Sequence, residues 1–475
     1  MTAPTQHRRF RSLLLNLLLL GATTVVALAL AEGALRFSRR TTPSEEVGGR
    51  KLEPDTLYGW VKKKDYVGRR TSTEFDVEER FNSRRIRGPE YPLAKPEGEY
   101  RILLLGDSFA EGYTVEFEQV LSEVMKRRLN ERTDFPVQVI NAGTAGWSTD
   151  QELLWLQQEG LAYEPDLVVL LFYINDIVSN ASNRYWRGYK PYYAAVDGEA
   201  GPTLELRGVP VPGADPPEEG PEAGDPTAAP APPPSTTGLR GWLLAHSMLY
   251  RDMSRLVKTS EPLFRVARAL RLTKESEPLR LAPPGEWAPW RNEPEPRMER
   301  AWRMSRLLIE GVQEEARKGG AEFLFVHAPS REAIHAWSWE NAQAMFHFDP
   351  EEWTPGAEED VLRTICQEDG MPCLFLREPF ELAMAEGGAA QGQDLYWRWD
   401  RHWNVLGNRV AGESIADRIF ETILTHGSPT AEPARAAALT AMPLTPSAPR
   451  RAASARHRGP DGGQRDARRR PLPSW

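Results

Sequence analysis

Two short segments, far apart in the chain, carry residue types suited to nucleophilic attack on an ester. Ser108 ends a Gly-Asp-Ser tripeptide that follows the apolar run 102–105, and Asp400 stands two residues before His402. A serine hydroxyl becomes an effective nucleophile when a base takes its proton, and that base needs a carboxylate to orient it. The pattern predicts Ser108 as nucleophile, His402 as base and Asp400 as orienting carboxylate. Either segment alone is weak support, because short motifs recur by chance.

Two further segments offer donors for the negative charge that develops on the attacked carbonyl oxygen. Gly146 would present an unobstructed backbone N–H, and Asn175 would present its side-chain amide. Each segment taken alone is more simply a turn at the end of a strand. Their common position, at the carboxyl ends of expected strands, favours a shared site with Ser108.

The elements that would position these residues alternate between strand and helix. Apolar runs predict buried parallel strands, and amphipathic stretches predict the helices between them. This alternation predicts an α/β domain. The expected strands cover 101–105, 136–140, 166–172 and 322–327, and the expected helices cover 115–130, 149–160, 297–317 and 406–424.

These blocks resemble the SGNH (GDSL) hydrolase superfamily, whose Ser, Gly, Asn and His blocks occur in this order. The resemblance extends over 101–426 apart from an insertion, and 81–88 is similar to the lead-in of membrane-anchored members. It implies a flavodoxin-like three-layer α/β/α fold with a mostly parallel sheet. It also implies Ser108 as nucleophile, an oxyanion hole of Ser108, Gly146 and Asn175, and no cofactor or metal.

Two departures from the family pattern bear on the reaction. Tyr173 stands where the third block usually has glycine, and the last block is Asp-x-His followed by Trp403 instead of Asp-x-x-His. The second spacing resembles enzymes that acetylate exported polysaccharides. Three hypotheses therefore stand: a serine-dependent ester hydrolase, an O-acyltransferase that modifies exported polysaccharide, and a catalytically silent glycan-binding protein. The intact Ser, Asn, His and Asp argue against the third.

Aromatic residues crowd the expected site and suggest a small acyl ester or an acylated glycan as substrate. Trp147, Tyr173 and Trp403 would present ring faces to a sugar, although ordinary core packing explains such rings equally well. Arg331 follows the fourth expected strand and would bind an acidic group, with a solvated side chain as the simpler alternative.

The chain divides by composition into four parts. We expect an insertion or cap at about 179–296, which includes a possible hairpin over 184–212, a Pro- and Gly-rich tract at 213–236 and an amphipathic segment at 240–258. The four parts are a membrane anchor or signal segment at 1–40, a lead-in lobe at 41–100, the hydrolase domain at 101–426 and a disordered basic tail at 427–475.

Residues 12–31 carry no charge and are mostly Leu, Ala and Val. This length is close to the roughly 20 residues that a helix needs to cross a bilayer, and a cleaved signal usually has a shorter apolar core. We expect an uncleaved single-pass anchor. Three arginines precede the segment and three follow it, so charge does not set the orientation. Export of the soluble part is the expectation, with an extracytoplasmic catalytic domain.

Charge and cysteine content add further limits. The formal net charge is −8, and the tail holds nine Arg against three acids, so the tail is +6 and the rest is −14. Bulk composition therefore gives no sign of nucleic-acid binding, and the tail is most simply a solvated appendage. Cys366 and Cys373 are the two cysteines; they would pair in an oxidising compartment or pack as small apolar residues. Their spacing is not that of a metal site.

Overall fold

The structure is a computed structural model of the 475-residue chain. It describes residues 50–72, 74–198, 201–212, 285–346, 349–385 and 394–424, together with parts of 15–33, residues 45–47 and scattered positions between 247 and 270.

A five-stranded parallel sheet forms the centre of the catalytic domain. Its spatial order is β14-β13-β8-β6-β7, which is the doubly wound order of flavodoxin-like folds. The order reverses between β6 and β8, so the loops after these two strands flank the topological switch point, where such folds bind ligands. The strands are β6 (Tyr100–Gly106), β7 (Val137–Asn141), β8 (Leu167–Phe172), β13 (Glu322–His327) and β14 (Cys373–Phe375).

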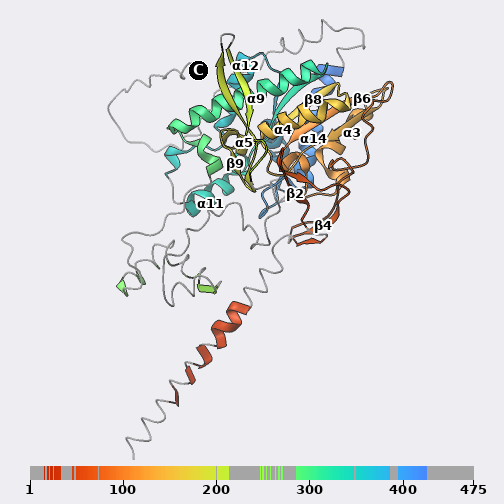
Figure 1. Ribbon diagram of the computed structural model, residues 1–475. Coiled ribbons are helices and arrows are strands. Elements are labelled where there is room, and N and C mark those ends of the chain that lie inside the picture. The colour runs from red at the N-terminus through yellow and green to blue at the C-terminus, as the bar shows by residue number, and fades with distance from the viewer. Residues whose placement is uncertain are drawn as a thin grey trace, which may run out of the picture.

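Helices cover both faces of this sheet, as Figure 1 shows. Alternate residues of β8 enter opposite apolar clusters: Val168 and Leu170 join one cluster, and Val169 and Leu171 join the other. The first cluster includes residues of α4 (Thr149–Gln158), α9 (Pro296–Lys318) and α12 (Glu358–Glu368), and the second includes residues of α3 (Leu121–Asn130) and α14 (Val405–Ile419). The result is three layers with two cores.

The segment before β6 forms a small β-rich lobe. β4 pairs with β1 and β5 in one antiparallel sheet, and β2 pairs with β3 in a hairpin. Lys51, at the edge of this lobe, is buried and pairs with Glu79 and with Glu111 of the catalytic domain. The strands are β1 (Glu45–Val47), β2 (Leu52–Asp55), β3 (Gly59–Lys62), β4 (Val67–Thr71) and β5 (Asp76–Arg80).

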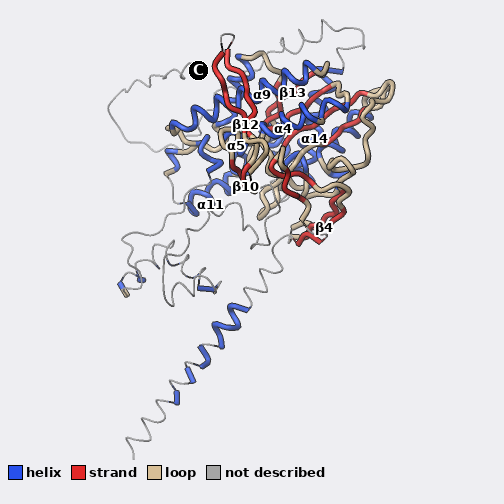
Figure 2. Tube along the Cα trace, viewed as in Figure 1, coloured by secondary structure: helices blue, strands red, loops and turns tan. Residues whose placement is uncertain are grey.

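Two hairpins follow β8. The short pair is β9 (Arg184–Tyr185) with β10 (Gly188–Tyr189), and the long pair is β11 (Tyr192–Gly198) with β12 (Gly201–Arg207). Figure 2 shows the long hairpin extending from the side of α9, which both of its strands contact.

Shorter helices complete the described structure. The first group is α2 (Ser108–Glu111), η1 (Phe117–Gln119), η2 (Gly160–Tyr163), α5 (Ile174–Ser179) and η3 (Gly285–Trp290). The second group is α10 (Arg331–Ile334), α11 (Ala336–Phe346), η4 (Pro350–Glu352), α13 (Arg377–Ala383) and the π-helical turn η7 (Phe420–Leu424).

The predicted α/β fold with a parallel sheet is confirmed, and the four expected strands differ from their observed bounds by at most one residue at either end. The helix expected over 115–130 is wrong at its start. Val120 is extended, with φ −65° and ψ 144°, so a 3₁₀ turn and a separate helix replace one long helix. The cysteine pair is now settled, because Cys366 of α12 forms a disulfide with Cys373 of β14.

Helical residues are described at 15–16, 19–20, 22–24 and 26–33 of the expected anchor. Among the described residues, no helix is both long and apolar enough to span a membrane. The tract 213–236, most of 240–258 and the tail 427–475 lie outside the described residues.

Candidate active site

Ser108 lies at the first turn after β6, where the backbone is tightly constrained. Gly106 has φ 153°, and a Cβ on it would lie 2.7 Å from the Ala110 Cβ, so a side chain does not fit there. Asp107 is the N-cap of α2 and its Oδ1 accepts the Phe109 N–H at 2.8 Å. This cap fixes the start of α2 and holds Ser108 at the switch-point edge of the sheet.

A continuous line of hydrogen bonds joins the three residues expected to form a triad. Ser108 Oγ lies 2.7 Å from His402 Nε2, and His402 Nδ1 lies 2.7 Å from Asp400 Oδ1. These are the distances at which a base can take a serine proton while a carboxylate orients its ring. The structure thus brings together residues that are 294 positions apart in the chain.

The charge state of Asp400 suits an orienting role. Burial by itself would raise the pKa of Asp400, but the neighbouring His402 and Arg70 and the hydrogen bond from His402 outweigh burial and hold that pKa below its usual range. The carboxylate therefore stays ionised opposite the imidazole.

Tyr113 is a member of this network that the sequence did not indicate. Its hydroxyl donates to Asp400, at 3.1 and 3.2 Å from the two carboxylate oxygens, and lies 2.8 Å from His402 Nδ1. Burial and the charge of Asp400 raise the pKa of Tyr113 well above its usual value, so the hydroxyl keeps its proton. In the sequence, one feature could have pointed to Tyr113: it lies shortly after Ser108 and directly follows Gly112, the left-handed residue that ends α2.

Gly146, the first expected oxyanion donor, lies in the loop after β7 with φ 75°. Its N–H makes no recorded hydrogen bond within the described part of the chain. A Cβ there would lie 2.3 Å from the Trp186 ring, so the indole of the β9–β10 turn rests directly on this glycine. Only glycine can adopt this left-handed conformation and still leave room for the Trp186 ring.

Asn175, the second expected donor, lies in the first turn of α5, after β8. Its Nδ2 donates to Asp107 Oδ2 at 3.0 Å, and its side chain is 7% exposed. An amide nitrogen carries two protons, and the second proton of Asn175 Nδ2 is directed at the Tyr185 hydroxyl oxygen at 3.4 Å, a longer contact than the bond to Asp107. Burial raises the pKa of Asp107, although the hydrogen bonds from Phe109 and Asn175 act against this change. Asp107 thus links the serine turn to the asparagine.

The structure contradicts two of the expected substrate contacts. Trp147 is 3% exposed and donates its indole N–H to the Trp60 carbonyl, and Trp403 is 1% exposed and packs on Phe109 and Phe380. Both rings are part of the apolar core, because large aromatic side chains gain most by burial. Neither presents a free face to a sugar.

Of the two other expected substrate contacts, Tyr173 lies near Ser108, whereas the Arg331 guanidinium is bonded within the protein. Tyr173 is half-buried against Phe109, with ring centroids 4.3 Å apart, and so lies beside the nucleophile turn. Arg331 donates to Ser338 and to the Arg398 carbonyl and pairs with Glu332. These partners tie the Arg331 guanidinium into the protein, so the expected contact with an acidic substrate has no support here.

Several residues near the site were missed by the sequence interpretation. Arg401, between the two triad residues, pairs with Glu332 at 2.9 Å and lies over the Trp287 ring at 5.5 Å. Glu286 of η3 lies close to Arg401 and His402; burial raises its pKa, and these two residues act in the opposite direction. η3 also contacts α5, so the segment around Glu286 lies beside Asn175. Nothing in the local sequence links this segment to the triad.

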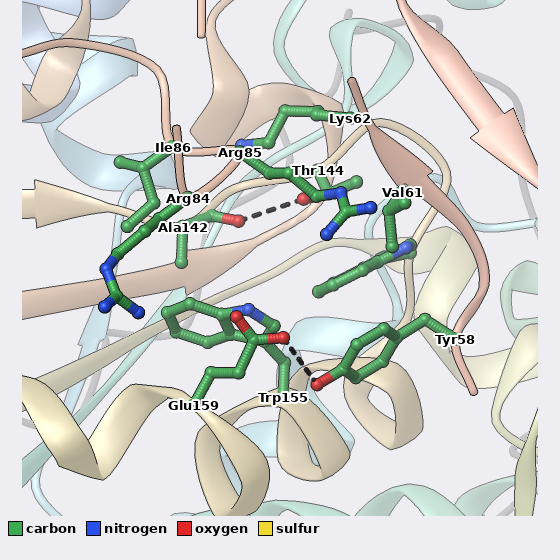
Figure 3. Close-up of a pocket in the computed structure, with 11 residues that line it drawn as sticks. Tyr58, Val61, Lys62, Arg84, Arg85, Ile86, Ala142, Thr144, Trp155 and Glu159 are labelled. Carbon is green, nitrogen blue, oxygen red and sulfur yellow. Dashed lines mark hydrogen bonds between the residues drawn. The ribbon is translucent and has the colours of Figure 1, made fainter. Parts of the chain in front are cut away.

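A separate small cavity lies between the lead-in lobe and the catalytic domain (Figure 3). Tyr58 and Lys62 come from the lobe, and Ala142 and Glu159 come from the domain. Its volume of about 20 Å³ is enough for about one water molecule, so it is not a substrate site. Among the described residues, no group of three or more His, Cys, Asp or Glu is arranged to hold a metal ion.

Comparisons with known proteins agree with this architecture. The sequence profile of the GDSL-like lipase/acylhydrolase family matches residues 104–351, a segment that holds Ser108, Gly146 and Asn175 and ends before Asp400 and His402. No curated protein matches the chain.

Solved structures that align with this chain include an acetyl xylan esterase, AlAXEase, with 13% identity, 68% of this chain and 99% of that chain covered and a TM-score of 0.31. A catalytic mutant of an acetylxylan esterase from Geobacillus stearothermophilus has 11% identity, coverage of 67% and 94% and a TM-score of 0.31. A lipase/acylhydrolase from Enterococcus faecalis has 14% identity, coverage of 67% and 95% and a TM-score of 0.31.

The profile match spans just over half of the chain and includes the Ser108 turn at the switch point of the sheet. The chain therefore belongs to the GDSL-like lipase/acylhydrolase family and is an ester-hydrolysing enzyme.

Proposed function

We propose that the protein hydrolyses acyl esters through a Ser108-His402-Asp400 mechanism. The observation that carries the proposal is the unbroken hydrogen-bonded line from Ser108 Oγ through both ring nitrogens of His402 to Asp400, with 2.7 Å at each step. The geometry matches the roles of nucleophile, base and orienting carboxylate.

The first half of the reaction forms an acyl-serine. Ser108 Oγ attacks the ester carbonyl carbon as its proton passes to His402 Nε2, and the carbonyl oxygen becomes an oxyanion. The N–H groups of Ser108 and Gly146 and the amide of Asn175 would stabilise this charge. The C–O bond to the alcohol then breaks, and the alcohol leaves with the proton from His402.

The second half returns the enzyme to its starting state. Water gives a proton to His402 and attacks the acyl carbon, and Ser108 leaves with that proton as the carboxylic acid is released. No step requires a metal or a cofactor.

Exposed tryptophans support an acylated glycan as the substrate. Trp399 precedes Asp400 and is 74% exposed, Trp186 on Gly146 is 40% exposed, and Trp337 is 36% exposed. Solvent-exposed aromatic rings are suited to stack on sugars. A saccharide would enter either as the alcohol of the ester or as the acceptor of the acyl group, and the latter is O-acyltransfer to polysaccharide.

Kinetics with and without a saccharide acceptor separate these reactions. A hydrolase releases acid from an acetylated oligosaccharide in water at a rate that added unacetylated oligosaccharide does not raise. A transferase yields acetylated acceptor, detectable by mass spectrometry, and releases little acid.

We further propose that residues 12–31 anchor the chain in a membrane, with the catalytic domain outside the cytoplasm. The uncharged apolar segment supports the anchor, and the Cys366–Cys373 disulfide supports an oxidising compartment. A membrane-impermeant reagent applied to intact cells should label the domain. A domain that stays wholly protected until the cells are broken would contradict this location.

The hydrolase proposal is tested with p-nitrophenyl acetate and the full chain. Ser108→Ala and His402→Ala should each lose at least about 1,000-fold in kcat/KM while they remain folded, because each removes a group that acts directly in attack. His335→Ala serves as the control, since His335 pairs with Asp394 away from the triad. Activity that survives in the folded Ser108→Ala variant would overturn the mechanism.

A further inference from the structure

The turn between β4 and β5 of the lead-in lobe contacts the segment that carries two triad residues. The Glu74 carboxylate accepts the Trp399 N–H, at 3.0 Å from each oxygen, and the Asp400 N–H, at 2.9 Å. Glu74 is 326 positions from Asp400 and lies in a turn of the lobe's β1-β4-β5 sheet, whereas Ser108 follows β6 of the five-stranded sheet. One side chain of the lobe therefore holds the backbone on which the orienting carboxylate stands.

The held segment is a tight and strained turn. The Trp397 N–H donates to the His402 carbonyl at 2.8 Å, and the Arg401 N–H donates to the Trp397 carbonyl at 3.0 Å. Arg401 has φ 75°, a left-handed conformation that is strained for a residue other than glycine. Such a conformation persists only where surrounding contacts determine it. Two of those contacts are the Glu74 bonds to the residues just before Arg401.

Other lobe residues contact the same part of the site. The Phe75 ring packs against Trp397 and Tyr113, with centroids 5.8 and 6.4 Å apart. The Arg70 guanidinium lies 4.2 Å from the Tyr113 ring centroid, and Tyr113 in turn donates to Asp400. The lobe thus contacts Asp400 in two ways: Glu74 bonds to the Asp400 backbone, and Arg70 and Phe75 pack on Tyr113, which bonds to the Asp400 side chain.

Attachment of the lobe does not by itself require Glu74. Lys51 pairs with Glu111, Arg87 donates to three backbone carbonyls of the catalytic domain, and Lys62 donates to the Gly143 carbonyl at 2.6 Å. Lys51, Arg87 and Lys62 are all buried, and Lys62 lines the cavity at this boundary in Figure 3. These three side chains bond to Glu111, to backbone carbonyls of the catalytic domain and to no triad residue, whereas Glu74 bonds directly to the backbone of Asp400.

We propose that Glu74 is a positioning residue that fixes the Asp400–His402 arm of the triad, so that the lead-in lobe is part of the active site. The proposal rests on the triad mechanism proposed above. Without Glu74, the turn relaxes around Arg401, Asp400 shifts, and His402 loses its fixed ring orientation.

The first test is the kinetics of Glu74→Ala in the full chain with p-nitrophenyl acetate. Displacement of a catalytic group by about 1 Å can cost up to about 100-fold in rate. We expect kcat to fall at least about tenfold with KM little changed, and Glu74→Gln, which keeps one acceptor oxygen, to recover part of the loss. Asp76→Asn is the matched control, because Asp76 lies on the same hairpin and bonds Arg69 and Thr71 instead of the triad segment. A folded Glu74→Ala protein with wild-type kcat would overturn the proposal.

Two further readouts separate positioning from a general loss of structure. The Glu74→Ala change should cost little in an Asp400→Asn background, because the group that it positions is already gone. An additive loss in the double variant would contradict the proposal. Proton NMR should also show a downfield His402 Nδ1–H resonance in the wild type and in Asp76→Asn that Glu74→Ala loses or shifts. This signal needs no substrate, so it tests Glu74 even if the protein fails to hydrolyse esters.

Discussion

His402 is held at both ring nitrogens, and Tyr113 adds a contact that a three-residue triad lacks. The phenol donates to Asp400 and lies 2.8 Å from His402 Nδ1. At the residue scale, the orientation of His402 depends on the groups that stabilise the Asp400 carboxylate. The Asp400 carboxylate accepts a bond from the Tyr113 hydroxyl and one from His402, and the Asp400 backbone N–H donates to the Glu74 carboxylate.

We predict that Tyr113→Phe lowers kcat for p-nitrophenyl acetate by about 5- to 30-fold. The change removes one hydrogen bond to an ionised carboxylate, worth about 1–2 kcal/mol, and keeps the ring that packs on Phe75. KM should stay near its wild-type value. An unchanged kcat would mean that Tyr113 has no part in orienting the base.

The sequence indicated Ser108, Asp400 and His402 as a set because these residue types suit nucleophilic attack on an ester and their blocks occur in the family order, and the structure brings them within hydrogen-bond distance. The positions of Glu74, Tyr113 and Glu286 near Asp400 and His402 could not be predicted, because each depends on a contact between segments distant in sequence. Trp147 and Trp403 show the opposite error: proximity in sequence to Gly146 and His402 suggested exposure, but both rings are buried.

At the scale of elements, the parallel sheet follows directly from its apolar strands. The runs that form β6 and β8 are buried on both faces, which leaves one favourable arrangement with helices on each side. The loops that contact the site follow no such pattern. Trp186 of the β9–β10 turn packs on Gly146, and this contact depends on tertiary packing and not on a local sequence pattern.

We predict that Gly146→Ala lowers both stability and activity. A Cβ would meet the Trp186 ring at 2.3 Å, and φ is 75°, so unfolding free energy should fall by about 1–3 kcal/mol and kcat by at least about tenfold. Thermal unfolding and esterase kinetics measure the two effects.

Gly320→Ala is the matched control, because Gly320 has φ 79° and open space around its Cβ position. It should lose comparable backbone stability and keep its activity. If both variants lose activity equally, the Gly146 loop has no special role in the reaction.

At the scale of the whole molecule, buried charges join the lobe to the catalytic domain. Burial would raise the pKa of Glu111, but Lys51 and Lys62 outweigh burial and lower it from 4.5 to about 2. Because the folded pKa lies below the unfolded value, stability from this carboxylate is complete above pH 4.5 and is lost as pH falls towards 2.

We therefore predict that Glu111→Gln is less stable than wild type by about 3 kcal/mol at pH 7, since it leaves buried lysines with less negative charge. The variant should also lose less stability than wild type between pH 4.5 and 2. Unfolding followed by circular dichroism across pH measures both. Exposed Glu314→Gln should leave the melting curve unchanged, and equal acid sensitivity in Glu111→Gln and wild type would contradict the assignment.

The most direct measurement of the central claim is covalent labelling with a fluorophosphonate, followed by peptide mass mapping. The account predicts one adduct per chain, on the peptide that contains Ser108, with esterase activity lost in step with labelling. Ser108→Ala should carry no adduct. An adduct on a different serine that removes activity, or full esterase activity in an unlabelled protein, would contradict Ser108 as the nucleophile.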